Sequence, residues 1–380
     1  MRKKGTAASD MRDITKIYVE PTNHCNLSCK TCMRHSWEEA LGFMPWQLYD
    51  KLLHDLMEFP SVETMAFAGF GEPLLHPRLP DMIRHAHKQG YRTILTTNGI
   101  LITQRLVYDL IAAGLNQVVV SIDGCSSDVF ADVRNERSLE KIIANMQLFS
   151  SESKKMRTYK DRITIGIEFV AMKRNLHEMP HLSHLASEIK ASFILVSHLL
   201  PYTEELKDEV LYNGRHTSHD SEGMPWMPRW ILPNIDWNML TSNALCEIFR
   251  KNQVMSFLDL NLNDRNHYCP FIKEGSVAVG WRGDVSPCPP LMHSYDCYIK
   301  ERKKRMKQCI VGSVGGTPLK DLWNDSSYAL FRQRVDNFDY PACSDCGGCD
   351  MVLTNESDCF GNNFPVCGDC LWARGLIRCA

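Results

Sequence analysis

The sequence predicts an α/β protein, in which a parallel sheet with helices outside it is followed by a cysteine-rich C-terminal region. Between residues 16 and 200, short apolar runs rich in β-branched residues alternate with amphipathic helical segments, a pattern typical of a parallel sheet covered by helices. Seven of the 16 cysteines lie between residues 343 and 379, and cysteines that merely fill a core would not cluster in this way. The clustering therefore predicts metal binding in the last third of the chain.

Six runs are predicted to be strands. They are residues 16–21, 64–69, 93–97, 117–122, 163–172 and 193–199. Six strand–helix repeats fit a doubly wound sheet or a barrel, complete or partial, and periodicity alone leaves these open. In each of these folds the chemistry is expected at the C-terminal ends of the strands.

The helices between these strands have recognisable ends. Leucines at every fourth position of 48–56 follow Pro45, a favourable first-turn residue, so one apolar stripe is expected to face the sheet. Residues 103–114 run from a capping threonine to a terminal glycine, and another helix is expected over 80–90. Ser138 is expected to begin a further helix.

The charge is nearly balanced, because 43 Lys+Arg face 45 Asp+Glu for a formal net charge of -2. This balance gives no basic footprint for nucleic acid and no polybasic membrane patch. No run approaches the ~18 apolar residues of a membrane span, and the charged start lacks the apolar core of a signal peptide. The sequence thus predicts a cytoplasmic protein, with neither nucleic acid nor a membrane as partner. Thiols in that reducing compartment usually bind metal or take part in catalysis.

Four regions are predicted along the chain. They are an N-terminal tail (1–15), the strand–helix repeats (16–200), a bridging segment (201–265) and an auxiliary domain (266–380). The bridging segment, which is rich in Trp, Pro, Asn and Asp, either lines a substrate cavity or is a surface insertion; the candidate lining residues are Trp226, Trp230 and Trp237. The auxiliary domain has few apolar residues and a hairpin expected to turn at Gly283 and Asp284, so metal clusters would supply missing stability.

Three cysteines follow the first predicted strand with the spacing Cys25-x3-Cys29-x2-Cys32. Three thiolates on one tight loop can bind three irons of a cubane cluster and leave the fourth iron open to a substrate or cofactor. A zinc ribbon would require two Cys-x2-Cys pairs, and this loop has one. The loop therefore favours an iron–sulfur cluster with an open coordination site.

At these residues the chain resembles the radical S-adenosylmethionine (SAM) enzymes, whose defining loop has this spacing. Further matches follow one per strand end. They are Gly69, Gly71, Glu72 and Pro73 for the SAM amino group, Thr97, Asn98, Ser121 and Asp123 near the methionyl and ribose groups, Arg134 for the SAM carboxylate, and Glu168, Val196 and His198 near ribose and adenine. A carboxylate such as Glu72 suits an ammonium in a partly dry site. Thr31, before the third loop cysteine, departs from the family's frequent aromatic residue and weakens the expected packing on adenine.

The resemblance implies a partial (β/α)6 TIM barrel and a radical reaction. SAM would chelate the open iron of a 4Fe–4S cluster held by Cys25, Cys29 and Cys32. Reductive cleavage would give a 5'-deoxyadenosyl radical that abstracts hydrogen from the substrate. The tasks left to the protein are binding, orientation and exclusion of water.

The last third resembles the SPASM type of auxiliary iron–sulfur domain, through Cys269, Gly283 and Cys288. The later cysteines depart from the usual spacing of that domain. The resemblance implies one or two auxiliary 4Fe–4S clusters: Cys269, Cys288 and Cys359 in one, and Cys343, Cys346, Cys349 with one of Cys367, Cys370 and Cys379 in the other. The remaining two of these last three would complete the first cluster or be structural thiols, and zinc is the alternative metal.

A narrower resemblance, over nearly the whole chain, is to the radical SAM maturases associated with tungsten-containing aldehyde ferredoxin oxidoreductases. It implies a tungstoenzyme, its cofactor precursor or a small peptide as substrate, with ferredoxin or flavodoxin as reductant. A radical SAM enzyme that forms a thioether or carbon–carbon crosslink in a peptide is the second hypothesis. The third is a non-catalytic iron–sulfur carrier or zinc-binding module, which would not need the Glu72, Asn98 and Asp123 constellation.

Overall fold

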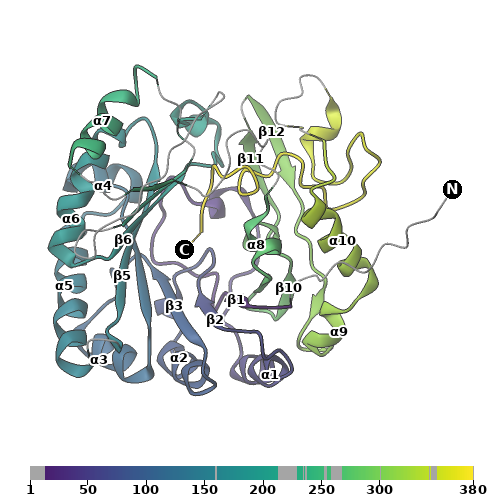
Figure 1. Ribbon diagram of the computed structural model, residues 1–380, viewed down its shortest axis with the longest axis horizontal. Helices are drawn as coiled ribbons and strands as arrows, with labels where there is room; N and C mark the ends of the chain where they lie inside the picture. The colour runs from purple at the N-terminus through teal and green to yellow at the C-terminus, as the bar shows by residue number, and fades with distance from the viewer. Residues whose placement is uncertain are drawn as a thin grey trace.

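One large, mostly parallel sheet forms the centre of the protein (Figure 1). The computed structural model describes residues 13–158, 161–212, 229–233, 235, 238–251, 255–257, 268–299, 301–341, 343 and 349–379. Within these ranges the sheet has eleven strands in the order β13-β10-β9-β1-β2-β3-β4-β5-β6-β7-β8. They are β1 (Lys16–Val19), β2 (Thr64–Phe67), β3 (Arg92–Thr97), β4 (Gln117–Ser121), β5 (Thr164–Ala171), β6 (Phe193–His198), β7 (Arg229–Leu232), β8 (Met255–Phe257), β9 (Ser276–Val279), β10 (Asp284–Ser286) and β13 (Gly312–Ser313). A separate antiparallel pair consists of β11 (Tyr295–Ile299) and β12 (Arg302–Met306).

The strand order decides between the two folds that the periodicity allowed. A doubly wound sheet reverses its strand order at a switch point and carries helices on both faces. Strands β1 to β6 instead follow one another in chain order, each parallel to the next. The connecting helices therefore lie on one side of the sheet, as Figure 1 shows for α2, α3, α5 and α6. This confirms the predicted α/β class with a partial barrel.

The helices begin and end close to the predicted residues. They are α1 (Trp46–Leu56), α2 (Leu79–Lys88), α3 (Gln104–Ala113), α4 (Ser127–Arg134), α5 (Leu139–Met156), α6 (Leu182–Ile189), α7 (Ser242–Lys251), α8 (Pro270–Lys273), α9 (Leu319–Trp323) and α10 (Ser326–Asn337). The Thr103 hydroxyl accepts a hydrogen bond from the Leu106 N–H at 3.3 Å, and Gly114 ends α3 with a φ of 97°. Ser138 precedes the first residue of α5 as expected, and its hydroxyl donates to Glu136. None of the helices described is long and apolar enough to cross a membrane.

The C-terminal region extends the same sheet. Strand β9 pairs in parallel with β1, and β10 and β13 continue antiparallel. The β9–β10 hairpin turns over residues 280–283, with Gly283 at a φ of 85°, and Asp284 already begins β10 instead of sharing the turn. Strands β7 and β8, in the predicted bridging segment, were not expected from the sequence. Trp226 and Trp237 lie outside the described residues, and for Trp230 only the backbone of β7 is described.

Both halves share one hydrophobic core. A single cluster of buried apolar side chains includes residues from Ile14, before β1, to Ile377, near the C-terminus. The C-terminal tail crosses to the end of β6, where the Leu376 carbonyl accepts from the His198 N–H at 3.2 Å and the Arg378 N–H donates to Ser197 at 3.1 Å. Figure 1 shows the chain end inside the mouth of the partial barrel. The tail therefore covers the strand ends at which chemistry is expected.

Candidate functional site

The loop with Cys25, Cys29 and Cys32 follows β1 at the C-terminal edge of the sheet. All three thiols are partly exposed. Burial raises the pKa of Cys25, and it raises the pKa of Cys32 to about 11. The loop is tied to neighbouring elements, because the Lys30 N–H donates to the Val133 carbonyl at 2.9 Å. Metal binding here would release the thiol protons.

The surroundings of these thiols fit an iron–sulfur cluster. Amide and guanidinium donors point at the sulfurs: Asn98 Nδ2 lies 4.0 Å from Cys25 Sγ, and Arg134 Nη1 lies 3.8 Å from Cys29 Sγ. Such donors stabilise thiolate ligands and tune the cluster. In the part of the chain that the structure describes, no three His, Cys, Asp or Glu side chains converge on one metal ion. A cubane takes one thiolate per iron, so its ligands stand apart.

Glu72, which follows β2, is hydrogen-bonded to residues at the end of β3. It is buried, and its carboxylate accepts from Thr97 Oγ1 at 2.7 Å, from the Asn98 N–H at 2.8 Å and from the Leu74 N–H at 3.0 Å. Burial raises the pKa of Glu72, against the opposing effect of these donors. The structure thus brings the predicted residues Glu72, Thr97 and Asn98 together, with the carboxylate fixing the loop that carries Asn98.

The glycines before Glu72 allow close packing against the cysteine loop. A Cβ on Gly71 would lie 2.1 Å from the Thr22 carbonyl oxygen and 2.6 Å from that of His24. The Glu72 N–H donates to the same His24 carbonyl at 2.7 Å. Gly69 has a φ of 138°, which side chains rarely adopt. The loop of residues 69–73, called the SAM-type loop below, is therefore in backbone contact with the cysteine loop that carries Cys25, Cys29 and Cys32.

We expect Gly71→Ala to lower the rate of SAM cleavage by about a hundredfold, because the methyl group pushes apart two loops whose spacing positions the reacting groups. The measurement is 5'-deoxyadenosine formation at several SAM concentrations. Gly316→Ala is the matched control, since nothing lies within 4 Å of a Cβ there and its φ is ordinary. Equal activity of the two variants would contradict the proposed loop contact.

Asp123 after β4, Glu168 of β5 and Arg134 at the end of α4 form a charged group in which Asp123 is buried and the other two are partly buried. Arg134 Nε lies 2.7 Å from Asp123 Oδ2, and Asp123 Oδ1 accepts from the Val170 N–H at 2.8 Å. Burial, aided by the charge of Asp123, raises the pKa of Glu168 to about 7. Arg134 was expected to meet the SAM carboxylate; in this structure its guanidinium is paired with Asp123 beside the cysteine loop.

The remaining predicted SAM contacts line the same edge of the sheet. Ser121 of β4 is in register with Glu168 of β5. Val196 and His198 of β6 are both buried, in register with Phe169 and Ala171. The strand ends of β1 to β6 therefore bring together the residues that the resemblance implied, one strand after another.

The auxiliary cysteines that the structure describes fall into two groups, and the first agrees with the expectation that two of the last three cysteines join Cys269 and Cys288. Cys269, Cys288, Cys367 and Cys370 line one apolar cavity together with Cys297. The first four thiols influence one another's pKa, whereas the charges that act on Cys297 are those of Asp369, Lys304 and Asp296. Burial raises the pKa of each of these thiols, that of Cys269 to about 12. Four thiols in one dry cavity suit a cubane with every iron bound.

Cys359 does not line the cavity that holds Cys269 and Cys288. Asp358 Oδ1 accepts from the Phe360 and Asn362 N–H groups, and this tight turn leaves Cys359 exposed. Burial and Asp369, with a smaller contribution from Cys359, raise the pKa of Cys343 to about 11, so Cys343 and Cys359 are neighbours. Cys349 is partly exposed, and Cys346 lies outside the described residues.

Cys379 belongs to neither group. The tail carries it to the barrel mouth, where it accepts from Trp372 Nε1 at 3.3 Å. Its thiol is accessible, yet burial and the nearby Glu168 raise its pKa to about 12.

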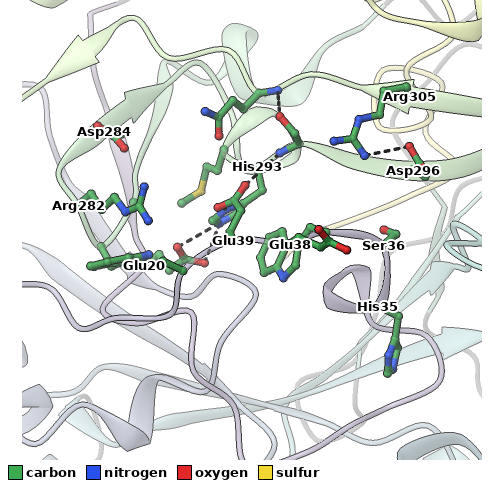
Figure 2. A pocket seen from close by; sticks show the side chains of 17 residues that line it. Glu20, His35, Ser36, Glu38, Glu39, Arg282, Asp284, His293, Asp296 and Arg305 are labelled. Atoms are coloured by element: carbon green, nitrogen blue, oxygen red, sulfur yellow. Dashed lines mark hydrogen bonds and ion pairs between the residues drawn. The ribbon is translucent and has the colours of Figure 1, made fainter.

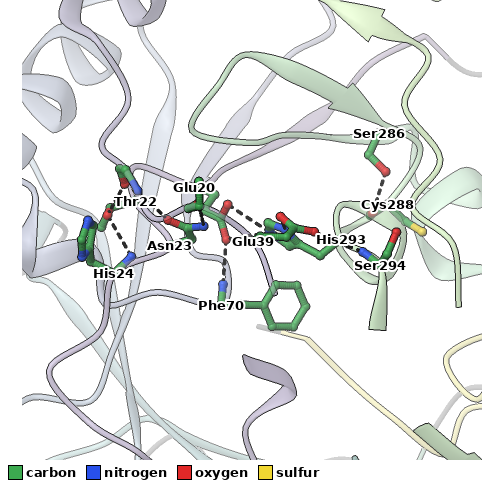
Figure 3. A network of polar contacts seen from close by, with 12 residues as sticks. Glu20, Thr22, Asn23, His24, Glu39, Phe70, Ser286, Cys288, His293 and Ser294 are labelled. Carbon is green, nitrogen blue, oxygen red and sulfur yellow. Dashed lines mark hydrogen bonds and ion pairs between the residues drawn. The ribbon is translucent and has the colours of Figure 1, made fainter. Parts of the chain in front are cut away.

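A polar cavity of about 840 Å³ lies beside the SAM-type loop (Figure 2). At its base, His293 Nε2 lies 3.1 Å from Glu20 Oε2, and His293 Nδ1 lies 2.8 Å from Glu39 Oε2 (Figure 3). Glu20 also accepts from the Phe70 N–H at 3.0 Å. This chain of contacts was not predicted from the sequence. The one local feature that could have indicated it is the carboxylate of Glu20, directly after the first strand.

We expect the stability contributed by His293 to depend on pH. Burial disfavours the imidazolium, but hydrogen bonds and charges from Glu20 and Glu39 outweigh that effect and raise the pKa of His293 to about 9. The unfolded value is about 6.5. The stabilisation is therefore complete below pH ~6.5 and is lost as the pH rises through about 9.

The thermal midpoint of the wild type should thus fall more steeply between pH 7 and 10 than that of His293→Gln. The difference corresponds to a free energy of unfolding on the order of 2 kcal/mol. His177→Gln is the control, because His177 is 65% exposed. Parallel curves for wild type and His293→Gln would show that the imidazolium does not form.

Comparison with known proteins assigns the class of this protein. Residues 19–171 match the radical SAM superfamily, and residues 269–350 match SPASM, an iron–sulfur cluster-binding domain. The protein is therefore a radical SAM enzyme, with SAM and a 4Fe–4S cluster as cofactors and an auxiliary domain that binds iron–sulfur clusters. The chain belongs to the family of the tungsten-containing aldehyde ferredoxin oxidoreductase cofactor-modifying protein of Pyrococcus furiosus, with 31% identity over 96% of each chain.

More distant relatives share part of the chain or only the fold. The Fe-coproporphyrin III synthase of Methanosarcina barkeri is 28% identical over 47% of this chain and 42% of its own. Streptococcus suis SuiB bound to precursor peptide SuiA matches with a TM-score of 0.57 and 15% identity, over 85% of this chain and 68% of that chain. The similarity to SuiB shows that the two proteins share a fold. Membership among the radical SAM enzymes decides against a non-catalytic carrier or zinc module.

Proposed function

We propose that this enzyme is a maturase that cleaves SAM reductively and abstracts hydrogen from a substrate linked to the maturation of a tungsten-pterin oxidoreductase. The observation that carries this proposal is the end-to-end similarity to the cofactor-modifying protein of Pyrococcus furiosus. The convergence of cysteine loop, Glu72 and Asp123–Arg134 at one sheet edge supports the SAM chemistry. The substrate is a tungstoenzyme, its cofactor precursor or a small peptide.

Cys25, Cys29 and Cys32 would hold the SAM-binding cluster. When bound, SAM and the reduced cluster supply a 5'-deoxyadenosyl radical. The loop from Gly69 to Pro73, fixed by the hydrogen bonds of Glu72, orients the amino group of SAM. The C-terminal tail, bonded to Ser197 and His198, keeps water from the strand ends.

We assign electron transfer to one group of auxiliary thiols. Cys269, Cys288, Cys367 and Cys370 line one cavity, so a cluster there would have every iron bound by cysteine and would transfer electrons. Cys343, Cys346, Cys349 and Cys359 would hold a second cluster. Ferredoxin or flavodoxin would be the external reductant.

A peptide modifier that forms a thioether or carbon–carbon crosslink is the second candidate. The polar cavity between the cysteine loop and the auxiliary region favours it, because a cavity of this size admits several residues of a peptide. The two candidates share the radical step and differ in the substrate that receives it.

Protein purified without oxygen should be brown, with about eight to twelve irons for two or three cubane clusters. Given SAM and a reductant, it should release methionine and 5'-deoxyadenosine, and a co-expressed tungstoenzyme or cysteine-bearing peptide should change in mass. Colourless, zinc-loaded protein without SAM cleavage would overturn the proposal. A mass change in the peptide alone, with the tungstoenzyme unaffected, would favour the second candidate.

A further inference from the structure

We propose that the cavity beside Glu20 and His293 is the substrate site, and that its ligand is a peptide segment carrying a basic side chain. This inference rests on the proposed function, because it names the substrate class of the same enzyme. Four separate segments of the chain enclose the cavity: the end of β1, residues 35–40, the β9–β10 turn and the β11–β12 pair. Figure 2 shows their charged side chains around a common space.

The cavity shares a wall with the SAM-type loop. The ring of Phe70, the residue between Gly69 and Gly71, lies edge-on to Trp37 at 5.7 Å and to His293 at 5.5 Å. Its N–H donates to Glu20, which a Cβ on Gly69 would also touch. A ligand in the cavity is therefore separated from the loop expected to bind SAM by one layer of side chains. The reacting residue of a bound peptide would therefore extend past this layer toward the radical, while the cavity holds the basic side chain.

The lining carries more negative than positive charge. Its carboxylates are Glu20, Glu38, Glu39, Asp284 and Asp296, and its cations are Arg282, Arg305 and protonated His293. His293 contacts Glu20 and Glu39, the charge of Arg282 also acts on Glu39, and Arg305 pairs with Asp296 at 3.0 Å. Three cations are thus set against three of the five carboxylates. Neither Glu38 nor Asp284 makes an ion pair with another described residue. These two carboxylates give the cavity its unmatched charge.

The chemistry of the lining selects among the possible substrates. The faces of tryptophans beside carboxylates attract ammonium and guanidinium groups, and Trp37 and Trp281 both line the cavity. Arg282 already lies over Trp281, 4.8 Å from its ring centre. The phosphate of a pterin precursor would instead meet an excess of carboxylates. The lining therefore favours a lysine- or arginine-bearing peptide over the pterin.

The test measures binding of short fluorescein-labelled peptides to the anaerobic holoenzyme with SAM, by fluorescence anisotropy at low ionic strength. Three matched peptides carry lysine, glutamine or glutamate at the same position. The wild type should bind the lysine peptide best. Glu38→Gln combined with Asp284→Asn should weaken that binding about tenfold, because two charge pairs are lost, and leave glutamine-peptide binding unchanged. Glu188→Gln, an exposed change on the distant helix α6, is the control.

Reversing the charge of Glu38 tests the inference through a gain of binding. Glu38→Lys should shift the preference from the lysine to the glutamate peptide, and Glu38 is exposed, so the fold tolerates the change. Absence of a lysine preference in the wild type, absence of peptide binding, or displacement of the lysine peptide by a phosphorylated pterin would overturn the inference. Formation of 5'-deoxyadenosine without peptide is measured in parallel, so failure of the proposed function is distinguished from failure of this site.

Discussion

A Cys29→Ala variant is expected to form no 5'-deoxyadenosine, while it keeps its auxiliary iron. Cys29 is the central thiol of a loop in which three cysteines must each hold one iron, so its loss removes the SAM-binding cluster. The auxiliary thiols lie on other segments, at residues 269–288 and 343–370. Iron content should therefore fall by about four per chain. Liquid chromatography of the reaction products and an iron assay measure the two effects.

Cys246→Ala is the matched control, because Cys246 is an exposed thiol on α7 outside either group of cysteines. It should retain both iron and activity. If Cys29→Ala formed 5'-deoxyadenosine as fast as the control, the loop would not hold the SAM-binding cluster. Loss of all iron would instead show that the auxiliary clusters depend on the first one.

Local patterns were enough to predict the elements of the barrel. Apolar runs predicted β1 to β6 within a few residues, since a strand buried on both faces must be apolar throughout. The cap at Thr103 and the glycine at Gly114 predicted both ends of α3. Strands β7 and β8 were missed, because three or four residues carry too little periodicity. The barrel was distinguished from the doubly wound sheet by the order of the strands, and hydrophobic periodicity carries no information on that order.

The site was predictable where it depends on neighbours in sequence. Cys25, Cys29 and Cys32 share one loop, and their spacing alone indicates shared metal. The contact between Glu20 and His293 joins residues 273 positions apart and requires β9 to pair with β1. Nothing local marks His293 for this position. Cys359 was assigned to the cluster of Cys269 and Cys288 by analogy with the SPASM domain. It is exposed, in the turn held by Asp358, and does not line the cavity that holds those two thiols.

The second large effect is expected from Lys304→Met. Lys304 in β12 and Asp369 are both buried, and Lys304 Nζ lies 3.0 Å and 2.9 Å from the two carboxylate oxygens. Removal of the lysine leaves an uncompensated buried carboxylate, which costs about 3–5 kcal/mol in the free energy of unfolding. Asp369 adjoins Cys370 and lines the same cavity as that thiol, so auxiliary iron should be lost as well. The thermal midpoint and the iron content measure these effects.

Lys303→Met is the matched control on the same strand. Lys303 is 61% exposed and pairs with Asp296, so water screens the pair and its loss should change the thermal midpoint little. Lys304→Met combined with Asp369→Leu should recover most of the stability, because the penalty comes from the unpaired charge and not from the missing lysine stem. An equally low midpoint in the double variant would assign the loss to packing. A Lys304→Met midpoint close to that of Lys303→Met would show that water reaches Asp369, and the pair would then count as a surface ion pair.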